Sequence, residues 1–324
     1  MKNFESFLAH QLNEFIAYRQ DLGYNITLSR AHFLVFDRYL KKTNADWQAL
    51  TASYFLEMRA NLEMEPNSIN HLFSSLRGFF NFLLRREEVN ENPLLDIPRL
   101  KENTVVPFVL SPEQIDQLLQ ALCRRVRRNE KHFLTDLAVY LTVLLLARCG
   151  MRISEPLMAM KHHYRKDDGT LYIEKTKFKK QRLIALPKAV MIDMDNYLTV
   201  RKSFHPHDQN PYLLAGKDHG PLKRGHIEHV FHQALKKIGI DQRRRVIGNT
   251  NFTQPAPHCL RHSFAVNTLI RIKERGESAQ SALPVLAAYL GHSKYQYTSV
   301  YLKVADAMSR KNLVDFSLWQ QKIR

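Results

Sequence analysis

One segment of the sequence restricts the possible folds more than any other. The segment Phe133–Cys149 is apolar almost all round, and a helix of that composition is stable only where protein surrounds it. Its longest apolar stretch, Leu137–Ala147, is interrupted by Thr142 and is too short to span a bilayer. We therefore expect a central helix in a globular core, and no membrane as a partner.

Apolar residues at helical spacing also dominate the first 100 residues. The clearest pattern predicts a helix over Ser68–Arg86, where apolar residues recur at spacings of three and four: Ile69, Leu72, Phe73, Leu76, Phe80 and Leu83. This helix should end before Asn92-Pro93, because proline disfavours helix in the residue before it. Residues 1–100 are expected to form a small helical bundle.

Prolines separate this bundle from the rest of the chain. Residues 93–107 contain three prolines and little periodicity, which is typical of an extended connection, and we place the linker at residues 101–110. A second domain, residues 111–324, then opens with Ser111-Pro112-Glu113. Serine at the cap, proline at the first helical position and an acidic residue after it are a strong helix start.

The second domain is expected to be mostly helical. After the central helix, further helices are predicted over residues 225–238, 260–271, 283–290 and 309–321. Leu171–Glu174 and Leu183–Leu186 have the composition of short strands, joined by a turn, and form the only convincing hairpin. The predicted fold class is therefore mainly α with a small antiparallel sheet and a C-terminal tail helix.

The charge balance indicates a polyanionic partner. The 324 residues include 48 Lys and Arg against 31 Asp and Glu, a net charge of +17, which favours nucleic acid over an anionic membrane surface. Residues 1–100 have a net charge of −1, so the other 224 have +18. A basic surface without a specific partner is the simpler alternative. The cysteines lack paired spacing and the N-terminus lacks a secretory pattern, so we expect a cytoplasmic protein.

The basic part of the chain contains the types of side chain that metal-free cleavage of a phosphodiester bond would require. That reaction needs neutralised phosphoryl charge, a nucleophile, an acceptor for its proton and a donor to the leaving oxygen. The forked arginine side chain suits the first task, and histidine and lysine suit proton transfer. Arg152 follows the central helix at a turn that Gly150 opens. Local pairing with Glu155 on the surface explains its position equally well.

A second cluster contains His258 and Arg261, which are three residues apart and share a helix face. His258 and His262 are four apart and have the spacing of zinc ligands, but no glutamate follows the first histidine and no further ligand set is evident. A satisfied core histidine is the better alternative. We expect neither a metal nor a cofactor.

Two further clusters are ambiguous by pattern alone. Residues 289–302 contain His292 and four tyrosines, namely Tyr289, Tyr295, Tyr297 and Tyr301. Such a stretch is usually core or stacking surface, and periodicity does not choose a nucleophile from it. The predicted hairpin turn is crowded with basic residues: Lys177, Lys179, Lys180 and Arg182. A loop that only contacts phosphate is the alternative for this turn.

Taken in this order, the clusters resemble the phage-integrase, or tyrosine recombinase, family over nearly the whole chain. Gly150–Glu155 is similar to the family's first arginine motif and His258–Ala265 to its H-x-L-R-H box. Tyr301 lies nine residues after His292, which is the family's spacing for its nucleophile. Lys177 matches the turn lysine of the family.

The chain also departs from the family pattern. The turn lacks the usual glycines, so the neighbouring lysines Lys179 and Lys180 stay rivals of Lys177. The spacing of 31 residues from Arg261 to His292 is longer than usual.

The resemblance implies a helical core-binding domain over residues 1–100 and a catalytic domain after the linker. It implies that Tyr301 forms a 3′-phosphotyrosyl link and that Lys177 protonates the leaving 5′-oxygen. His258 would act as general base. The complete site it implies is Arg152, Lys177, His258, Arg261, His292 and Tyr301, with the arginines and His292 binding the phosphate.

The implied partners are double-stranded DNA, three further copies of the chain on paired sites, and accessory recombinases or directionality factors. The tail, with Leu313, Phe316, Leu318 and Trp319, either docks on a neighbouring copy or packs on its own domain. The favoured role is integration or excision of a mobile element. Alternatives are a chromosome-dimer resolvase of the Xer type, a catalytically silent DNA-binding protein on the same scaffold, and a type IB topoisomerase.

Overall fold

The chain forms two compact units, Met1–Thr104 and Val105–Arg324. The structure, a computed structural model, describes residues 3–174, 181–216, 220–240, 242–292 and 295–322, without the side chains from position 310 onward. The turn lysine Lys177 and its rivals Lys179 and Lys180 lie outside the described residues. So do the apolar side chains of the predicted tail.

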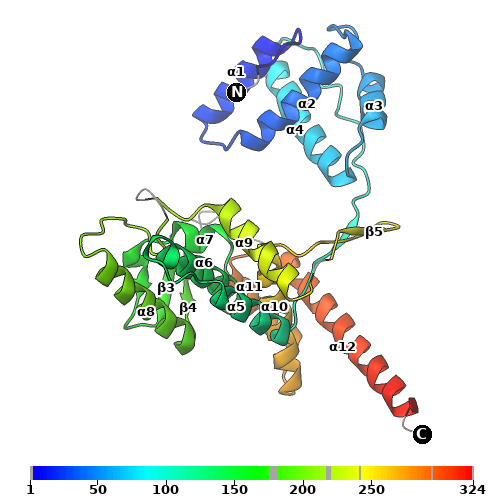
Figure 1. Cartoon of the computed structure of the whole chain (residues 1–324). Helices are drawn as coiled ribbons and strands as arrows, with labels where there is room; N and C mark the ends of the chain where they lie inside the picture. The colour runs from blue at the N-terminus through cyan, green and yellow to red at the C-terminus, as the bar shows by residue number, and fades with distance from the viewer. Residues whose placement is uncertain (1–2, 175–180, 217–219, 241, 293–294, 323–324) are drawn as a thin grey trace. The chain divides into compact units, whose positions relative to one another are not determined.

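The first unit is a helical bundle (Figure 1), as the sequence predicts. Its helices are α1 (Ala9–Asp21), α2 (Thr27–Thr43), α3 (Ala52–Asn61) and α4 (Pro66–Arg85). Helix α4 begins two residues before the predicted start and ends one residue before the predicted end. The face predicted from its periodicity is buried, and it packs against aromatic side chains of the other helices: Phe15, Phe33, Phe36 and Phe55.

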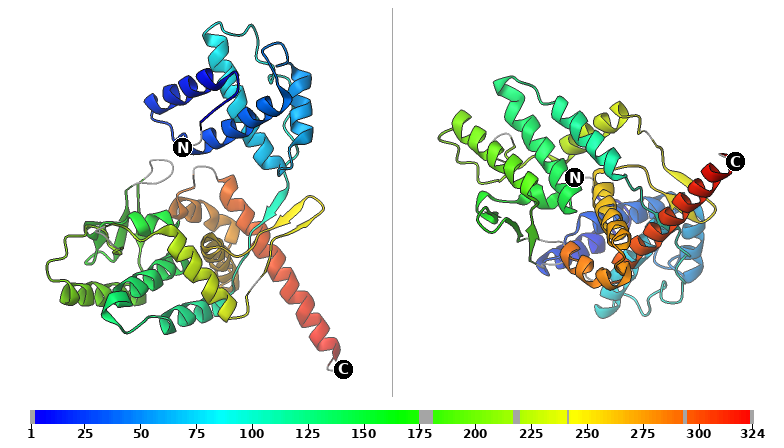
Figure 2. Two further views of the ribbon diagram at one scale, coloured as in Figure 1. Left: turned by 45° about the horizontal axis from the view of Figure 1, so that its top comes forward. Right: turned by 90° about the horizontal axis from the view of Figure 1, so that it is seen from below.

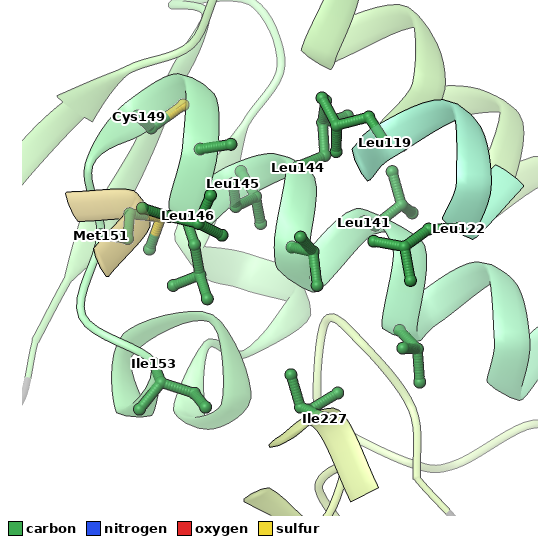
Figure 3. Close-up of a cluster of buried hydrophobic side chains, with 14 of the residues drawn as sticks. Leu119, Leu122, Leu141, Leu144, Leu145, Leu146, Cys149, Met151, Ile153 and Ile227 are labelled. Carbon is green, nitrogen blue, oxygen red and sulfur yellow. The ribbon is translucent and has the colours of Figure 1, made fainter. Parts of the chain in front are cut away.

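The second unit is built around α6 (Glu130–Cys149), which confirms the central helix (Figure 3). Leucines and other apolar side chains of α6 pack against neighbouring elements, with Leu119, Leu122, Met151 and Ile227 among their partners. By length and composition, α6 is the one helix among the described residues that could cross a membrane, although the apolar stretch Leu137–Ala147 alone is too short to do so. The helix extends to Glu130, and most of it is buried inside the protein, as expected of a core helix.

Several further helices complete the second unit. Helix α5 (Pro112–Arg124) begins at Pro112 with Ser111 as its cap, which confirms the predicted start, and Gln114 completes a capping box. The remaining helical elements are α7 (Ser154–Met158), η1 (Lys161–His163), α8 (Lys188–Phe204), α9 (Arg224–Lys237), α10 (Pro257–Glu274), α11 (Ala279–Leu290) and α12 (Gln296–Lys322).

The last helix differs from the prediction. Helix α12 begins at Gln296 and not near Ser309, so Tyr301 stands on its second turn. Its first turns lie beside α10 and α11 (Figure 2).

The described residues form two small antiparallel sheets in place of the one predicted. The predicted hairpin is confirmed to within one residue as β3 (Thr170–Ile173) and β4 (Arg182–Ala185), with β2 (Tyr164–Arg165) on its outer edge. The prediction of a single hairpin was wrong. Strands β5 (Arg245–Ile247) and β6 (Thr250–Phe252) form a second hairpin, and β1 (Thr104–Val106) joins it within the predicted linker. These strands have three residues each and are mostly exposed, so they lack the apolar alternation that marks a strand.

Candidate active site

Arg152 is positioned by the end of the central helix. Gly150 caps α6 in the left-handed conformation, with φ of +58°, which glycine adopts without steric penalty. A Cβ atom at this position would lie 2.4 Å from the ring of Phe264, so both the turn and the close approach require glycine. The chain then reverses, and the guanidinium of Arg152 turns back toward α11.

Three arginines from separate elements bind three consecutive carbonyl groups at the C-terminal end of α11. Arg182 Nε donates to the carbonyl oxygen of Tyr289 at 2.9 Å, and Arg152 NH2 donates to that of Gly291 at 3.0 Å. Between them, Arg261 NH2 donates to the carbonyl oxygen of Leu290 at 2.5 Å. The last carbonyls of a helix have no partner within it, so these arginines complete the helix end immediately before His292.

Glu155 holds two of these arginines together. Its carboxylate is buried and accepts from both terminal nitrogens of Arg182, at 2.9 and 2.8 Å, and from Arg152 NH1 at 3.1 Å. Burial alone would raise the pKa of Glu155, but hydrogen bonds from Arg182 and its charge outweigh this and lower the pKa. The alternative explanation of Arg152, local pairing with Glu155 on the surface, therefore named the correct partner, but Glu155 is buried, Arg152 is only partly exposed, and the pair belongs to a larger cluster.

The cluster has more positive than negative charge. Arg152, Arg182 and Arg261 face the single carboxylate of Glu155 among the residues described around them. Arg261 is 1% exposed, and burial together with the charge of Arg152 lowers its pKa to about 10, so it stays cationic at neutral pH. A buried excess of cationic guanidinium groups is suited to an anion with several oxygens, such as a phosphodiester.

Of the four tyrosines in the ambiguous stretch, Tyr301 has the setting of a nucleophile. Tyr295 and Tyr297 are largely exposed, and the hydroxyl of Tyr289 donates to the carbonyl oxygen of Cys149. Tyr301 is 5% exposed, and its hydroxyl lies 2.9 Å from Nδ1 of His262. Burial raises the pKa of Tyr301, and the charges of Arg261 and Arg152 oppose that rise.

The two predicted site histidines, His292 and His258, lie close to Tyr301 and to its partner His262, respectively. The ring centroid of His292 is 6.1 Å from that of Tyr301, and Nδ1 of His292 is 2.7 Å from the hydroxyl oxygen of the buried Thr298. Burial, followed by the charges of Arg261 and Arg152, lowers the pKa of His292 to about 4. His258 is exposed at the start of α10, and its ring centroid is 4.6 Å from that of His262. Desolvation and the charges of the same two arginines lower the pKa of His258 as well.

The structure thus brings five of the six predicted residues into one region, while Lys177 lies outside the described residues. Among the described residues, no group of three His, Cys, Asp or Glu side chains is arranged to hold a metal ion. Three members of the cluster were not predicted as site residues: Glu155, Arg182 and His262. Glu155 stands three residues after Arg152 in the first arginine motif, and this proximity in sequence was the available signal. His262 directly follows Arg261, but its partner Tyr301 is 39 residues away, so proximity in sequence did not indicate that contact. For Arg182, the only signal in the sequence was its position close to the predicted turn lysine.

Comparison with known proteins identifies the family. The model of the phage integrase family matches residues 109–308. The putative integrase/recombinase y4rE of Sinorhizobium fredii is 26% identical, with 93% of each chain covered, and the tyrosine recombinase XerD of Shewanella oneidensis is 27% identical, with 91% of this chain and 87% of that one covered.

A similar fold occurs in a solved structure of the XerH site-specific recombinase in a post-cleavage complex with a palindromic difH substrate. The likeness has a TM-score of 0.69 at 17% identity and covers 96% of this chain and 84% of that one. At this identity it supports the fold alone. Together with the family match over well over half of the sequence, these findings show that the chain belongs to the phage integrase family of tyrosine recombinases.

Proposed function

We propose that this protein is a site-specific DNA recombinase that cuts and rejoins DNA through a 3′-phosphotyrosyl intermediate on Tyr301. The observation that supports this most directly is the position of a buried tyrosine hydroxyl within the field of Arg152 and Arg261. A protein that only binds DNA does not need a buried nucleophile beside a cluster of arginines. The family membership agrees with the proposal, since the named relatives are recombinases.

In the proposed cleavage step, the Tyr301 oxygen bonds to the scissile phosphorus and the bond to the 5′-oxygen breaks. Arg152 and Arg261 bind the non-bridging oxygens and stabilise the charge that develops on them. His292 is fixed by Thr298 through Nδ1, which leaves Nε2 available to hydrogen-bond the phosphate. Loss of either arginine should cost about 3–4 kcal/mol of transition-state stabilisation, by analogy with other fixed donors to an oxyanion.

Lys177 is proposed to protonate the leaving 5′-oxygen, with Lys179 and Lys180 as rivals in the same stretch of sequence between β3 and β4. The support comes from the neighbouring strand, since Arg182 at the start of β4 is bound to Glu155 and Tyr289 in the arginine cluster. A lysine fits the task because its ammonium group donates a proton and also neutralises charge. The 5′-hydroxyl of a partner strand then attacks the phosphotyrosyl bond and reverses the chemistry.

The proposed partner is duplex DNA, bound as a tetramer on paired recombination sites in the cytoplasm. Residues 1–100 are proposed as the core-binding domain and residues 111–324 as the catalytic domain. Integration or excision of a mobile element is the favoured role, because the turn without glycines and the long spacing from Arg261 to His292 depart from compact resolvases. The relatives include both an integrase/recombinase and an Xer recombinase. A chromosome-dimer resolvase therefore stays the second candidate.

The direct test uses a suicide DNA substrate, in which a nick close to the scissile phosphate lets the short fragment with the freed 5′-hydroxyl diffuse away and so traps the covalent complex. The wild-type protein should form this complex, and Tyr301→Phe should bind the same DNA but form none. A strand-exchange assay on paired sites separates a recombinase from a topoisomerase, which relaxes DNA without exchanging strands. Failure of the wild-type protein to form any covalent complex would contradict the proposal.

A further inference from the structure

The hydroxyl of Tyr301 has a specific partner, His262, which is the last residue of the H-x-L-R-H box but has no role in the site that the family resemblance implies. His262 Nδ1 lies 2.9 Å from this hydroxyl, and the two ring centroids are 5.5 Å apart. Across the described part of the chain, no other side chain is hydrogen-bonded to the Tyr301 hydroxyl. We infer that His262 receives the phenolic proton of Tyr301 during DNA cleavage and returns it during rejoining. This inference rests on the proposed function, because it assigns a role within the same site.

The other two histidines are less well placed for this proton. His258 stands one turn earlier on α10 and is exposed to solvent. Its ring packs against the His262 ring in a T-shaped arrangement, with the centroids 4.6 Å apart and an interplanar angle of 85°. His292 already uses Nδ1 for the hydroxyl of Thr298. His258 and His292 are therefore suited to contact the phosphate, while His262 faces the nucleophile.

The surroundings keep His262 neutral in the absence of DNA. Burial, followed by the charges of His258, Arg261 and His292, lowers the pKa of His262 to about 3. A neutral imidazole can accept a proton, and acceptance at Nδ1 requires the hydrogen to be on Nε2. A DNA phosphate bound at the arginines brings negative charge close to the ring, which raises the pKa of a histidine. The base should therefore become stronger only when the substrate is in place.

The proton balance of the step is complete without a further reactant. The Tyr301 oxygen bonds to phosphorus, and its proton passes to Nδ1 of His262. The bond from phosphorus to the 5′-oxygen breaks, and that oxygen takes a proton from the general acid, which we propose to be Lys177. In rejoining, the 5′-oxygen attacks phosphorus and the proton on His262 returns to the departing tyrosine oxygen.

The test is the pH dependence of single-turnover cleavage by His262→Asn. The asparagine amide can hold a hydrogen bond near the position of Nδ1, but it does not take up a proton at neutral pH. The substrate is a suicide duplex with sulfur in place of the bridging 5′-oxygen, because a thiolate leaves without a general acid. The measurement therefore reports on the base and not on the lysine.

We expect His262→Asn to cleave about 100- to 10,000-fold more slowly than wild type at pH 7, the usual contribution of a general base. Its rate should rise about tenfold per pH unit from pH 6 to 9, because the phenol must then ionise without help. The wild-type rate should level off above the pKa of the base. His207→Asn, which changes an exposed histidine on the loop after α8, should behave as wild type. His258→Asn should be slower than wild type and keep its pH profile.

Two results would overturn the inference. One is a His262→Asn rate within threefold of wild type. The other is a rate that is reduced equally at every pH, since a merely structural role lowers the rate without changing the profile. DNA affinity and thermal unfolding test whether each variant is folded. If His262→Asn does not fold, His262→Gln is measured in the same way. Failure of the proposed function is distinguishable, because the wild-type protein would then form no covalent complex.

Discussion

Glu155 connects the charge of the site to the stability of the fold. It is buried, and its lowered pKa means that the folded state favours its ionised form. The stability that it contributes is therefore fully present above the ordinary carboxyl pKa of about 4.5 and is lost as the pH falls through the lower folded value. Replacement by a neutral amide removes this contribution at every pH.

We predict that Glu155→Gln lowers the free energy of unfolding by about 3 kcal/mol at pH 7, because it leaves Arg152 and Arg182 without their shared counter-charge. The difference from wild type should shrink below pH 4.5, where the carboxyl of the unfolded chain becomes protonated, and should become small below the lower folded pKa, where the wild-type carboxyl is neutral in both states. Denaturant unfolding at pH 7, 5 and 3.5 measures this.

The matched control is Glu277→Gln, which changes an exposed glutamate after α10. It should have little effect at any of these pH values. A Glu155→Gln penalty that stays constant down to pH 3.5 would show that the carboxylate charge is not what stabilises the cluster.

At the scale of elements, the end of α6 positions the first arginine. We predict that Gly150→Ala destabilises the fold by about 2–5 kcal/mol, from the left-handed backbone and the overlap with Phe264 together. Cleavage should fall as well, because the carbonyl of Gly150 accepts a hydrogen bond from Arg261 NH1 at 2.8 Å. Denaturant unfolding and single-turnover cleavage report the two effects.

Two other glycines separate the causes. Gly239 has φ of +77° with open space around its Cβ position, so Gly239→Ala should cost only about 1–2 kcal/mol of backbone strain. Gly225 has neither the strained backbone nor a close neighbour, and Gly225→Ala should change stability by less than about 0.5 kcal/mol. The account of this turn fails if all three alanine variants are equally stable.

The elements that the sequence predicted well have local causes. Helix α4 follows from apolar periodicity, the start of α5 from Ser111 and Pro112, and the hairpin of β3 and β4 from apolar runs beside a basic turn. The hairpin of β5 and β6 was missed because its strands have three residues each and neither has a buried residue to mark an apolar face. Its one local signal is the two-residue turn Gly248-Asn249, with φ of +58° at the glycine, which is typical of tight hairpins.

The site was predictable only in part, because local sequence signals do not report contacts between distant segments. The residue types of Arg152, Arg261 and Tyr301 and their order along the chain suggested the chemistry, but not the contacts between them. Glu155 and Arg182 are 27 residues apart, and Arg152 meets the carbonyl of Gly291 at a separation of 139 residues. Contacts of this range depend on how helices pack and leave no periodic pattern in one sequence. The partnership of His262 with Tyr301 is likewise formed only when α12 packs on α10.

At the scale of the whole molecule, charge is divided unequally between the two units. Residues 1–104 have a net charge of −1 and the second unit has +18. Binding to DNA releases counterions from neutralised phosphates, so affinity falls with salt in proportion to the number of phosphate contacts. The second unit should therefore account for most of the salt dependence of DNA binding.

We predict that replacing Arg243, just before β5, and Arg245, on β5, with alanine reduces the slope of log affinity against log salt by about 1–2, because both side chains are exposed. The matched change in the first unit, alanine at Lys42 and Arg85, should reduce the slope by less. Fluorescence anisotropy over a range of salt concentrations measures both. Equal reductions would show that the net charge of a unit does not indicate where DNA is contacted.

The central claim concerns one oxygen atom, and one measurement tests it most directly. The covalent complex trapped on a suicide substrate is digested with protease and nuclease, and mass spectrometry identifies the residue that bears the 3′-phosphate. The account predicts a single adduct on Tyr301, the buried tyrosine that faces His262 and the arginines. An adduct on Tyr289, Tyr295 or Tyr297, or a covalent complex that persists in Tyr301→Phe, would contradict it.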